Sequence, residues 1–373
     1  MDIGRIKGLA RNLKGEIIEM RRHIHMRPEI SWHEAETSSF IENKLISLKL
    51  DNIKKGFGGT DSGVTAELSG DPSGPCVALR ADIDALPINE ENALEHRSRN
   101  KGAMHACGHD GHTAALLGAA KILSSMKEAI PGKIRFIFQP AEEIGAPSGA
   151  QVMIAEGALD GVCMIGGMHL WSFVRTGLVQ WRNGPAMASS DRLSVVFTGK
   201  GGHGAMPHTA IDPIIAVANY VLAIQTITSR EINPLESAVV SIGKIDSGDT
   251  FNIIPGEARL MGSLRSFSPD VRGAMEERLR RIADGIASAY RCSAETTVAY
   301  MLPSLANDLK ATEILRETAE EAVGSDNVEE SAPLMVSEDF GLYLKRVPGT
   351  FFFLGAGNAD KGANFPHHSP RFD

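Results

Sequence analysis

The sequence predicts an α/β protein in which helices flank a mostly parallel mixed sheet and a smaller βαββαβ unit is inserted into the chain. Short apolar runs alternate with helical patterns in both halves of the chain, which is typical of buried parallel strands. The middle of the chain follows a different order of elements. With 373 residues, the chain also exceeds the size at which one hydrophobic core usually stops growing, so we expect two domains.

The main domain is predicted from its helical spacings and apolar runs. Residues 1–50 place apolar side chains at helical intervals, and residues 112–123 are apolar on nearly every side, which indicates a buried helix. Four short apolar runs predict buried strands, at residues 76–79, 134–138, 162–165 and 350–354. Ligands of parallel sheets bind outside the carboxyl ends of the strands, and polar residues follow these runs.

The middle region predicts a complete ferredoxin-like unit. Its expected elements are a strand at 193–197, a helix at 212–229, strands at 237–245 and 257–267, a helix at 269–290 and a strand at 293–301. A continuation of the main sheet is the alternative, and the hairpin of two successive strands argues against it. We therefore expect a main domain of residues 1–183 and 298–373 and an inserted domain of residues 184–297.

The composition argues against several classes of function. The formal net charge is -8, whereas nucleic acids and anionic membranes attract basic surfaces. No apolar run is long enough to span a bilayer, and the first residues contain no apolar signal segment. The cysteines form no CxxC pair, which favours free thiols in a reducing compartment. We expect a cytoplasmic protein that binds neither nucleic acid nor membranes.

The densest polar cluster is MHACGHDGHTA, at residues 104–114. Cys107 and His109 are two positions apart, so both side chains lie on the same side of an extended or looped segment. Cysteine and histidine are both ligands of transition metals. A buried cysteine in a turn beside solvated histidines is the alternative, and three histidines within eight residues favour a metal.

A pair of glutamates follows the second predicted strand, in the sequence FQPAEE. Adjacent side chains leave the backbone in different directions. One of Glu142 and Glu143 can therefore bind a metal while the other acts as a base. A solvated acidic turn is the common alternative, and the pair alone is weak evidence.

Two further histidine positions extend the set. His169 follows the third predicted strand and two glycines, and a satisfied core histidine is the alternative there. His367 or His368 in FPHHSPRFD offers a last ligand, unless this segment is only a polar tail. Together these donors exceed the four that one tetrahedral ion takes, and they suit two ions about 3.5–4 Å apart.

Two aspartates and a glycine loop complete the candidates. Asp82 and Asp84 follow the first predicted strand, and Asp84 is the candidate partner for the second nitrogen of a metal-bound histidine, or else a turn residue. Residues 199–204 match GxGxxG, the pattern of a dinucleotide-binding oxidoreductase. However, Pro207 interrupts the helix that should follow, and no acidic residue closes a next strand. We interpret the loop as one that presents His203.

The ordered motifs resemble the M20 metallopeptidase clan, and specifically its amidohydrolase branch, which includes hippurate hydrolases, N-acyl-amino-acid amidohydrolases and auxin-conjugate hydrolases. The resemblance covers nearly the whole chain. It rests on RRHIHMRPE, ALRADIDALPI, HACGHDGHTA, FQPAEE, GMHLW, GGHGAMPH, NIIP, SEDF and HHSP. Cys107 stands where related carboxypeptidases and aminoacylases carry a bridging aspartate, which points to this branch.

The resemblance implies a role for each matching residue. It implies metal ligation by Cys107, His109, Glu143, His169 and His368. Glu142 matches the general base. His203, Asn252 and Arg265 match positions of the inserted lid domain that contact substrate, with the histidine reaching across a dimer. Glu338 in SEDF matches a residue behind the ligands, or only a helix start.

The activity implied is metal-dependent hydrolysis of the amide bond of N-acyl amino acids, such as acetyl or benzoyl derivatives. We expect two divalent ions per subunit, Mn or Zn in the first place, with Co and Ni as alternatives. The partners expected are a small N-acyl amino acid and a second subunit, in a homodimer or a tetramer built through the lid. An M20 dipeptidase or carboxypeptidase is one alternative, and a catalytically idle metal-binding relative is another.

Overall fold

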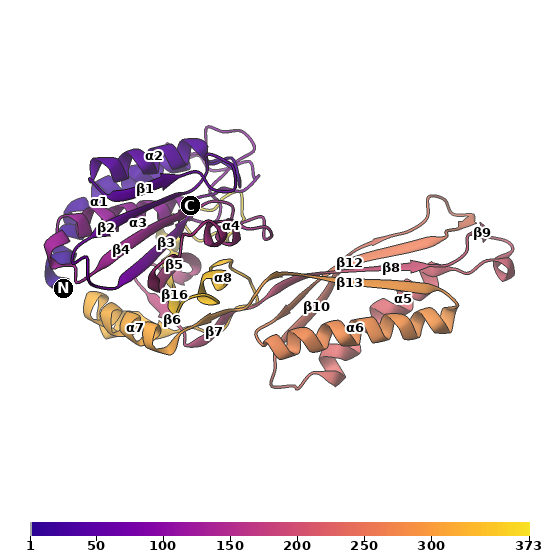
Figure 1. The fold of residues 1–373 in the computed structure, drawn as a ribbon. Coiled ribbons are helices and arrows are strands. Elements are labelled where there is room, and N and C mark those ends of the chain that lie inside the picture. The colour runs from indigo at the N-terminus through magenta and orange to yellow at the C-terminus, as the bar shows by residue number, and fades with distance from the viewer. Residues whose placement is uncertain (1) are drawn as a thin grey trace. The chain divides into compact units, whose positions relative to one another are not determined.

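The structure, a computed structural model, describes residues 2–373 and divides them into two compact units. The first unit comprises the chain up to Ala186 together with Ala306–Ala332 and Asp339–Asp373. The second comprises Met187–Leu305 and the short segment Pro333–Glu338. Figure 1 shows the elements of both.

The first unit is built on an eight-stranded mixed sheet with the order β1-β2-β4-β3-β5-β16-β6-β15. At its centre, β3 pairs in parallel with β4 and β5, and β5 pairs in parallel with β16. The strands are β1 (Asp51–Lys55), β2 (Val64–Ser69), β3 (Cys76–Asp82), β4 (Lys133–Gln139), β5 (Val162–Arg175), β6 (Val179–Trp181), β15 (Val328–Glu330) and β16 (Gly349–Gly357). The prediction of a mostly parallel mixed sheet is confirmed, and the four predicted strands are its four central members.

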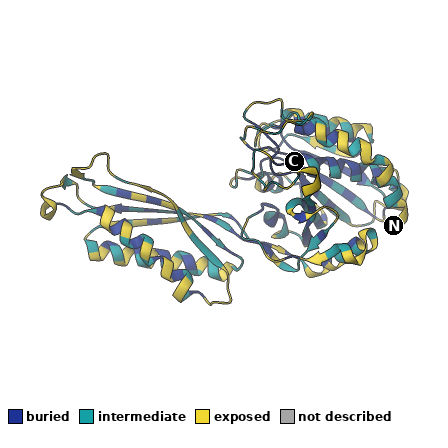
Figure 2. Ribbon diagram, turned by 180° about the vertical axis from the view of Figure 1, so that it is seen from behind, coloured by how far each residue is buried: buried dark blue, intermediate teal, exposed yellow. Residues whose placement is uncertain are grey.

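Helices cover this sheet and share its core. Met20 of α1, Ile41 of α2 and Leu117 of α3 pack in one cluster with Phe136 and Phe138 of β4. In Figure 2 the buried residues follow the strands, and the outward sides of these helices are exposed. The helices of this unit are α1 (Ile3–His25), α2 (Ala35–Ser47), α3 (His109–Ser124), α4 (Gly149–Ala155), α7 (Leu309–Val323) and α8 (Phe340–Leu344).

Two predicted boundaries are wrong in a way that matters for the site. The helix expected at 112–123 begins earlier, at His109, so Cys107 and His109 do not lie on one extended segment. Gly108 adopts a left-handed conformation with φ 90° and turns the chain between them. The strand expected at 162–165 continues to Arg175 because it keeps pairing with β16, so His169 lies within a strand.

The second unit contains a four-stranded antiparallel sheet with the order β10-β12-β8-β13. Its two helices lie on one face of that sheet (Figure 1), where Tyr220 and Leu279 join its core. The elements are β8 (Ser190–Thr198), α5 (Pro213–Ala223), β10 (Ala238–Asp246), β12 (Glu257–Ser266), α6 (Pro269–Tyr290) and β13 (Ser293–Leu302). The helix expected at 212–229 ends at Ala223, and a short π-helical turn (Ile227–Glu231) follows it.

Two small ribbons complete the fold. β9 (Gly202–His203) pairs with β11 (Ile253–Ile254) in the second unit, and β7 (Gly184–Met187) pairs with β14 (Leu305–Asn307) where the chain passes between the units. Among residues 2–373, no helix is both long and apolar enough to cross a membrane.

Candidate metal centre

Five predicted ligands of the first unit converge beyond the central strands. His109 opens α3 after the left-handed Gly108, Glu143 follows the end of β4, and His169 lies in β5. Cys107 and His368 come from irregular segments, and a hydrogen bond from the His368 N–H to the Ala106 carbonyl (2.8 Å) joins those segments. The fold thus brings together side chains that are far apart in the sequence.

The distances between these side chains fit a metal centre. Cys107 Sγ lies 3.5 Å from His169 Nε2, and Glu143 Oε1 lies 3.8 Å from His109 Nε2 and 3.4 Å from His368 Nε2. The donor atoms of Cys107, His109 and His169 all lie within 4.8 Å of one another, as do those of Cys107, Glu143 and His368. Cys107 belongs to both groups.

The surroundings of the donors also favour a bound cation. His109 Nε2 and Glu143 Oε1 are buried, and neither makes a hydrogen bond of good geometry within residues 2–373, although His368 Nε2 lies 3.4 Å from Glu143 Oε1. A buried polar atom without a partner is costly, and a metal ion would satisfy both. The mixture of sulfur, nitrogen and oxygen donors is one that Zn and related ions accept. The residues present therefore fit a divalent metal pair.

Burial sets the protonation of two of the donors. Burial and the neighbouring Glu143 carboxylate raise the pKa of the Cys107 thiol well above its ordinary value, so this sulfur needs a nearby cation to ionise. Burial lowers the pKa of His169 well below its ordinary value and keeps the ring neutral. Its Nδ1 donates to the Leu170 carbonyl (2.6 Å), which leaves Nε2 available as a ligand.

Asp84 makes hydrogen bonds to two of the predicted ligand residues. Its carbonyl oxygen lies 2.9 Å and its Oδ1 3.2 Å from His109 Nδ1, so this nitrogen donates to Asp84 and Nε2 faces the centre. Its Oδ2 accepts the backbone N–H of Glu143 (3.0 Å) and the hydroxyl of Ser31 (2.7 Å). The residue therefore fixes both a histidine and the glutamate loop.

Comparison with known proteins agrees with this geometry. The sequence pattern of peptidase family M20/M25/M40 matches residues 78–373. The chain belongs to this family.

Similar proteins include one named as a deacetylase and one named as a carboxypeptidase. N-acetyl-L-cysteine deacetylase of Bacillus subtilis (strain 168) is 43% identical over 343 residues, which are 92% of this chain and 81% of that protein. Thermostable carboxypeptidase 1 of Saccharolobus solfataricus is 40% identical over 370 residues, 99% of this chain and 93% of that protein. A crystal structure of the Bacillus subtilis YXEP protein, described as a dinuclear metal-binding M20 peptidase, has a TM-score of 0.85 and 36% identity, with 97% of this chain and 93% of that chain covered.

Glu142, the predicted base of this M20 protein, lies beside the predicted ligands. One of its carboxylate oxygens lies within 4.8 Å of donor atoms of both His109 and Glu143. The preceding Ala141 is left-handed, with φ 51°, and its N–H donates to the buried carboxylate of Glu34 (2.9 Å). Burial, and then the Asp84 charge, raise the pKa of Glu34 to about 7. Glu34 thus fixes the backbone just before Glu142 and Glu143, a role that was not predicted from the sequence.

A second buried network was also missed. His112 Nδ1 lies 2.6 Å from Asp82 Oδ1, and its Nε2 accepts the N–H of Leu170, next to His169 (2.9 Å). Arg80 joins Asp82 (2.7 Å) to Asp339 (2.7 Å) inside the same unit. The signal for His112 was its spacing, because residues three apart share one face of a helix, and His109 begins that helix.

Two neighbouring histidines near the end of the chain take different positions. His368 has a left-handed backbone (φ 63°) and lies against Glu143. His367 instead stacks on Trp171, with ring centroids 4.6 Å apart, and its Nε2 donates to the Leu170 carbonyl (2.9 Å). Of the two, the structure brings His368 to the centre.

The predicted residues of the second unit lie in three separate places. His203 pairs with Ile253 in the small ribbon, and the Gly204 N–H donates to the Asn252 carbonyl (2.9 Å), so His203 and Asn252 are neighbours. Arg265 lies near the other end of β12, where its guanidinium donates to the Met335 carbonyl (3.2 Å). Glu338 is buried at the end of the segment Pro333–Glu338, directly before Asp339.

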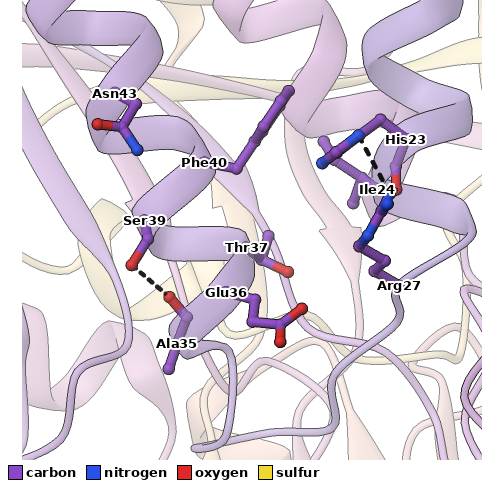
Figure 3. A pocket seen from close by; sticks show the side chains of 9 residues that line it. All are labelled: His23, Ile24, Arg27, Ala35, Glu36, Thr37, Ser39, Phe40 and Asn43. Carbon is purple, nitrogen blue, oxygen red and sulfur yellow. Dashed lines mark hydrogen bonds between the residues drawn. The ribbon is translucent and has the colours of Figure 1, made fainter.

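A cavity of about 440 Å³ lies elsewhere in the first unit, between the end of α1 and α2 (Figure 3). His23 stacks on Phe40 at one side, with ring centroids 4.4 Å apart, and Arg27 contacts His23. None of the predicted metal ligands lines this cavity. It is therefore separate from the metal centre.

Proposed function

We propose that this protein hydrolyses the amide bond of N-acyl amino acids in a metal-dependent reaction that releases a carboxylic acid and a free amino acid. The observation that carries the proposal is the convergence of Cys107, His109, Glu143, His169 and His368 beside a second carboxylate, Glu142. The similarity to an N-acetyl-L-cysteine deacetylase supports the same reaction, because an acetylated amino acid is a simple N-acyl amino acid.

The proposed ligands would hold two divalent ions, and the Cys107 sulfur belongs to both groups of donors. The cysteine donor suits Zn, whereas the glutamate and histidine donors also accept Mn; we propose Mn or Zn in the first place, with Co and Ni as alternatives. When bound, such a pair supplies a Lewis acid and lowers the pKa of water toward neutrality. Asp84 and Glu338 are proposed to orient the ligands without binding metal themselves. The hydrogen bonds of Asp84 to His109 and Glu143 support this role for Asp84.

Glu142 is the proposed general base and acid. Its carboxylate takes a proton from water as the water oxygen attacks the amide carbonyl. When the carbon–nitrogen bond breaks, the same carboxyl group returns the proton to the leaving amine. The reaction therefore balances with one water consumed, and Glu142 ends as it began.

The substrate contacts proposed for the second unit require a partner subunit. His203 is assigned to the developing oxyanion, and Arg265 and Asn252 to the substrate carboxylate. The small ribbon of β9 and β11, which carries His203, lies beyond the Glu257 end of β12. Glu257 is eight residues from Arg265, or roughly 26 Å along the strand. One copy of the unit cannot place His203 and Arg265 on one small substrate, whereas two copies can contribute one residue each.

A homodimer, or a tetramer of such dimers, is therefore part of the proposal, with residues 184–297 acting as a lid and dimerisation domain. Helix α5 presents Ile214, Ile215 and Leu222 to solvent, with 43%, 46% and 72% of their surfaces exposed. An apolar stripe of this kind is typical of a protein interface.

We also propose a cytoplasmic location, which the four free cysteines favour.

The test is a hydrolysis screen on protein stripped with a chelator and reloaded with Mn²⁺ or Zn²⁺. N-acetyl and N-benzoyl amino acids should be cleaved, and removal of the metal should abolish turnover. Faster cleavage of dipeptides would instead favour a peptidase, the alternative that the similarity to a thermostable carboxypeptidase supports. Two bound ions with no hydrolysis of either class would contradict the proposal and indicate an idle metal-binding relative.

A further inference from the structure

We propose that Arg21 of α1 is a positioning residue for the metal centre. It joins the start of the helix that carries His109 to the segment that carries His368, and so holds that second ligand in place. The inference rests on the proposed function in one respect, namely that these histidines bind metal. Its physical basis is a set of contacts within the first unit.

The guanidinium of Arg21 spans two carboxylates from distant parts of the sequence. Its Nε lies 2.8 Å from Asp110 Oδ2, and its Nη2 lies 2.7 Å from Asp373 Oδ1. Asp110 directly follows His109 and is fully buried, and it also contacts His25 Nδ1 (2.8 Å). A planar guanidinium can hold two carboxylates at once, which a lysine ammonium does with less directional control.

The segment 364–373 depends on such contacts because it contains no helix and no strand. The Glu91 N–H donates to the Pro370 carbonyl (2.8 Å), and the Asn92 amide donates to the Phe372 carbonyl (2.9 Å). Phe372 is buried against Cys107 and Ala106. Together with the Arg21–Asp373 pair, these contacts determine where the segment lies.

His368 is the ligand that most needs this support. Its side chain is 53% exposed, whereas that of His109 is 1% exposed. His109 is also fixed by Asp84 and by the first turn of a buried helix. Loss of Arg21 should therefore displace His368 more than His109, and should weaken the ion that His368 helps to hold more than its neighbour.

The experiment compares metal binding by Arg21→Met, Arg21→Lys and Arg22→Met in the full chain. Arg22 is the matched control, since it is the next residue of α1 and no ion pair or hydrogen bond of its side chain is found among residues 2–373. Metal-free protein is titrated with Mn²⁺ by calorimetry, and bound ions are counted after gel filtration.

We expect two ions in the wild type and in Arg22→Met. In Arg21→Met we expect one ion with near wild-type affinity and one bound about 10–100-fold more weakly, with partial recovery in Arg21→Lys. Asp373→Ala is a milder variant that should weaken the same ion, and its combination with Arg21→Met should add little. Two ions of wild-type affinity in Arg21→Met, or equal weakening of both, would overturn the proposal.

Hydrogen exchange gives a readout that needs neither metal nor activity. Amides of residues 365–373 should exchange faster in metal-free Arg21→Met than in metal-free wild type or Arg22→Met. Unchanged exchange would contradict the proposal that Arg21 holds this segment in place. A wild type that binds two ions but hydrolyses no N-acyl amino acid would defeat the proposed function and leave this inference standing, so the two failures are distinguishable.

Discussion

The metal centre of the first unit and the small ribbon of the second unit have opposite surroundings. Around the centre, His109, Asp82 and Asp84 are almost fully buried. Asp84 hydrogen-bonds to His109, and Asp82 to His112. At the ribbon, His203 and Asn252 are exposed, and the neighbouring Phe251 is completely exposed. The centre is organised by contacts within one unit, whereas the ribbon exposes its side chains to solvent.

This contrast indicates which residues can act without further assembly. Ligands held by buried partners are already oriented before a metal or substrate binds, and little ordering remains to be done. Exposed side chains on a two-stranded ribbon have fewer neighbours to fix them, so ordering them on a substrate costs more conformational entropy. Changes at the centre should therefore alter chemistry, metal binding or stability, and changes at the ribbon should alter turnover alone.

The largest effect is expected for Glu142→Gln. The variant keeps the shape of the side chain but cannot take a proton, so turnover of an N-acetyl amino acid should fall about 10²–10⁴-fold. Metal content, measured by mass spectrometry, should remain that of the wild type, as in the matched control Glu313→Gln, an exposed residue of α7. Wild-type turnover in Glu142→Gln would exclude the residue as the base.

His203→Ala should lower turnover about 10²–10³-fold without loss of metal, because it removes one group that stabilises the oxyanion. Mixing this variant with Glu142→Gln tests the dimer. If the histidine acts across the interface, one site of each mixed dimer is complete and activity returns. A mixture as inactive as its components would refute the exchange of residues between subunits.

Asp82→Asn should lower the stability of the first unit by about 3–5 kcal/mol, because it breaks a buried pair with Arg80. The control is Glu156→Gln, whose exposed pair with Lys54 should contribute about 1 kcal/mol or less. Thermal unfolding of the metal-free proteins measures both changes. Equal effects would show that the buried network is not the stabilising feature proposed.

The smallest effect is expected from pH at His25. Burial by itself lowers the pKa of this histidine, but the Asp110 carboxylate raises it from 6.5 to about 9. The pair should therefore stabilise the fold fully below pH 6.5 and lose this contribution as the pH rises through about 9. The difference in Tm between the wild type and His25→Gln should shrink by a few degrees over that range. A constant difference would contradict the assignment.

Much of the first unit could be predicted from local patterns. The four central strands were recognisable because strands buried on both sides are continuous apolar runs. The edge strands β1 and β15 were not, since five and three residues with exposed side chains carry little periodic signal. The continuation of β5 past His169 was missed for a related reason, as pairing with β16 decides it and no local residue does.

The chemistry predicted for the site follows from the residues, because ligand side chains and their order along the chain are properties of the sequence. The residues alone pointed to Cys107, His109 and His169 and left open the choice within each pair, Glu142 or Glu143 and His367 or His368. The family resemblance selected Glu143 and His368. Only the tertiary structure brought His368 to Glu143 and turned its neighbour onto Trp171. The roles of Arg21, Glu34 and His112 were likewise decided there. Each of these residues acts through partners distant in sequence. Such contacts leave no local pattern for Arg21 and Glu34, whereas His112 shares a helix face with His109.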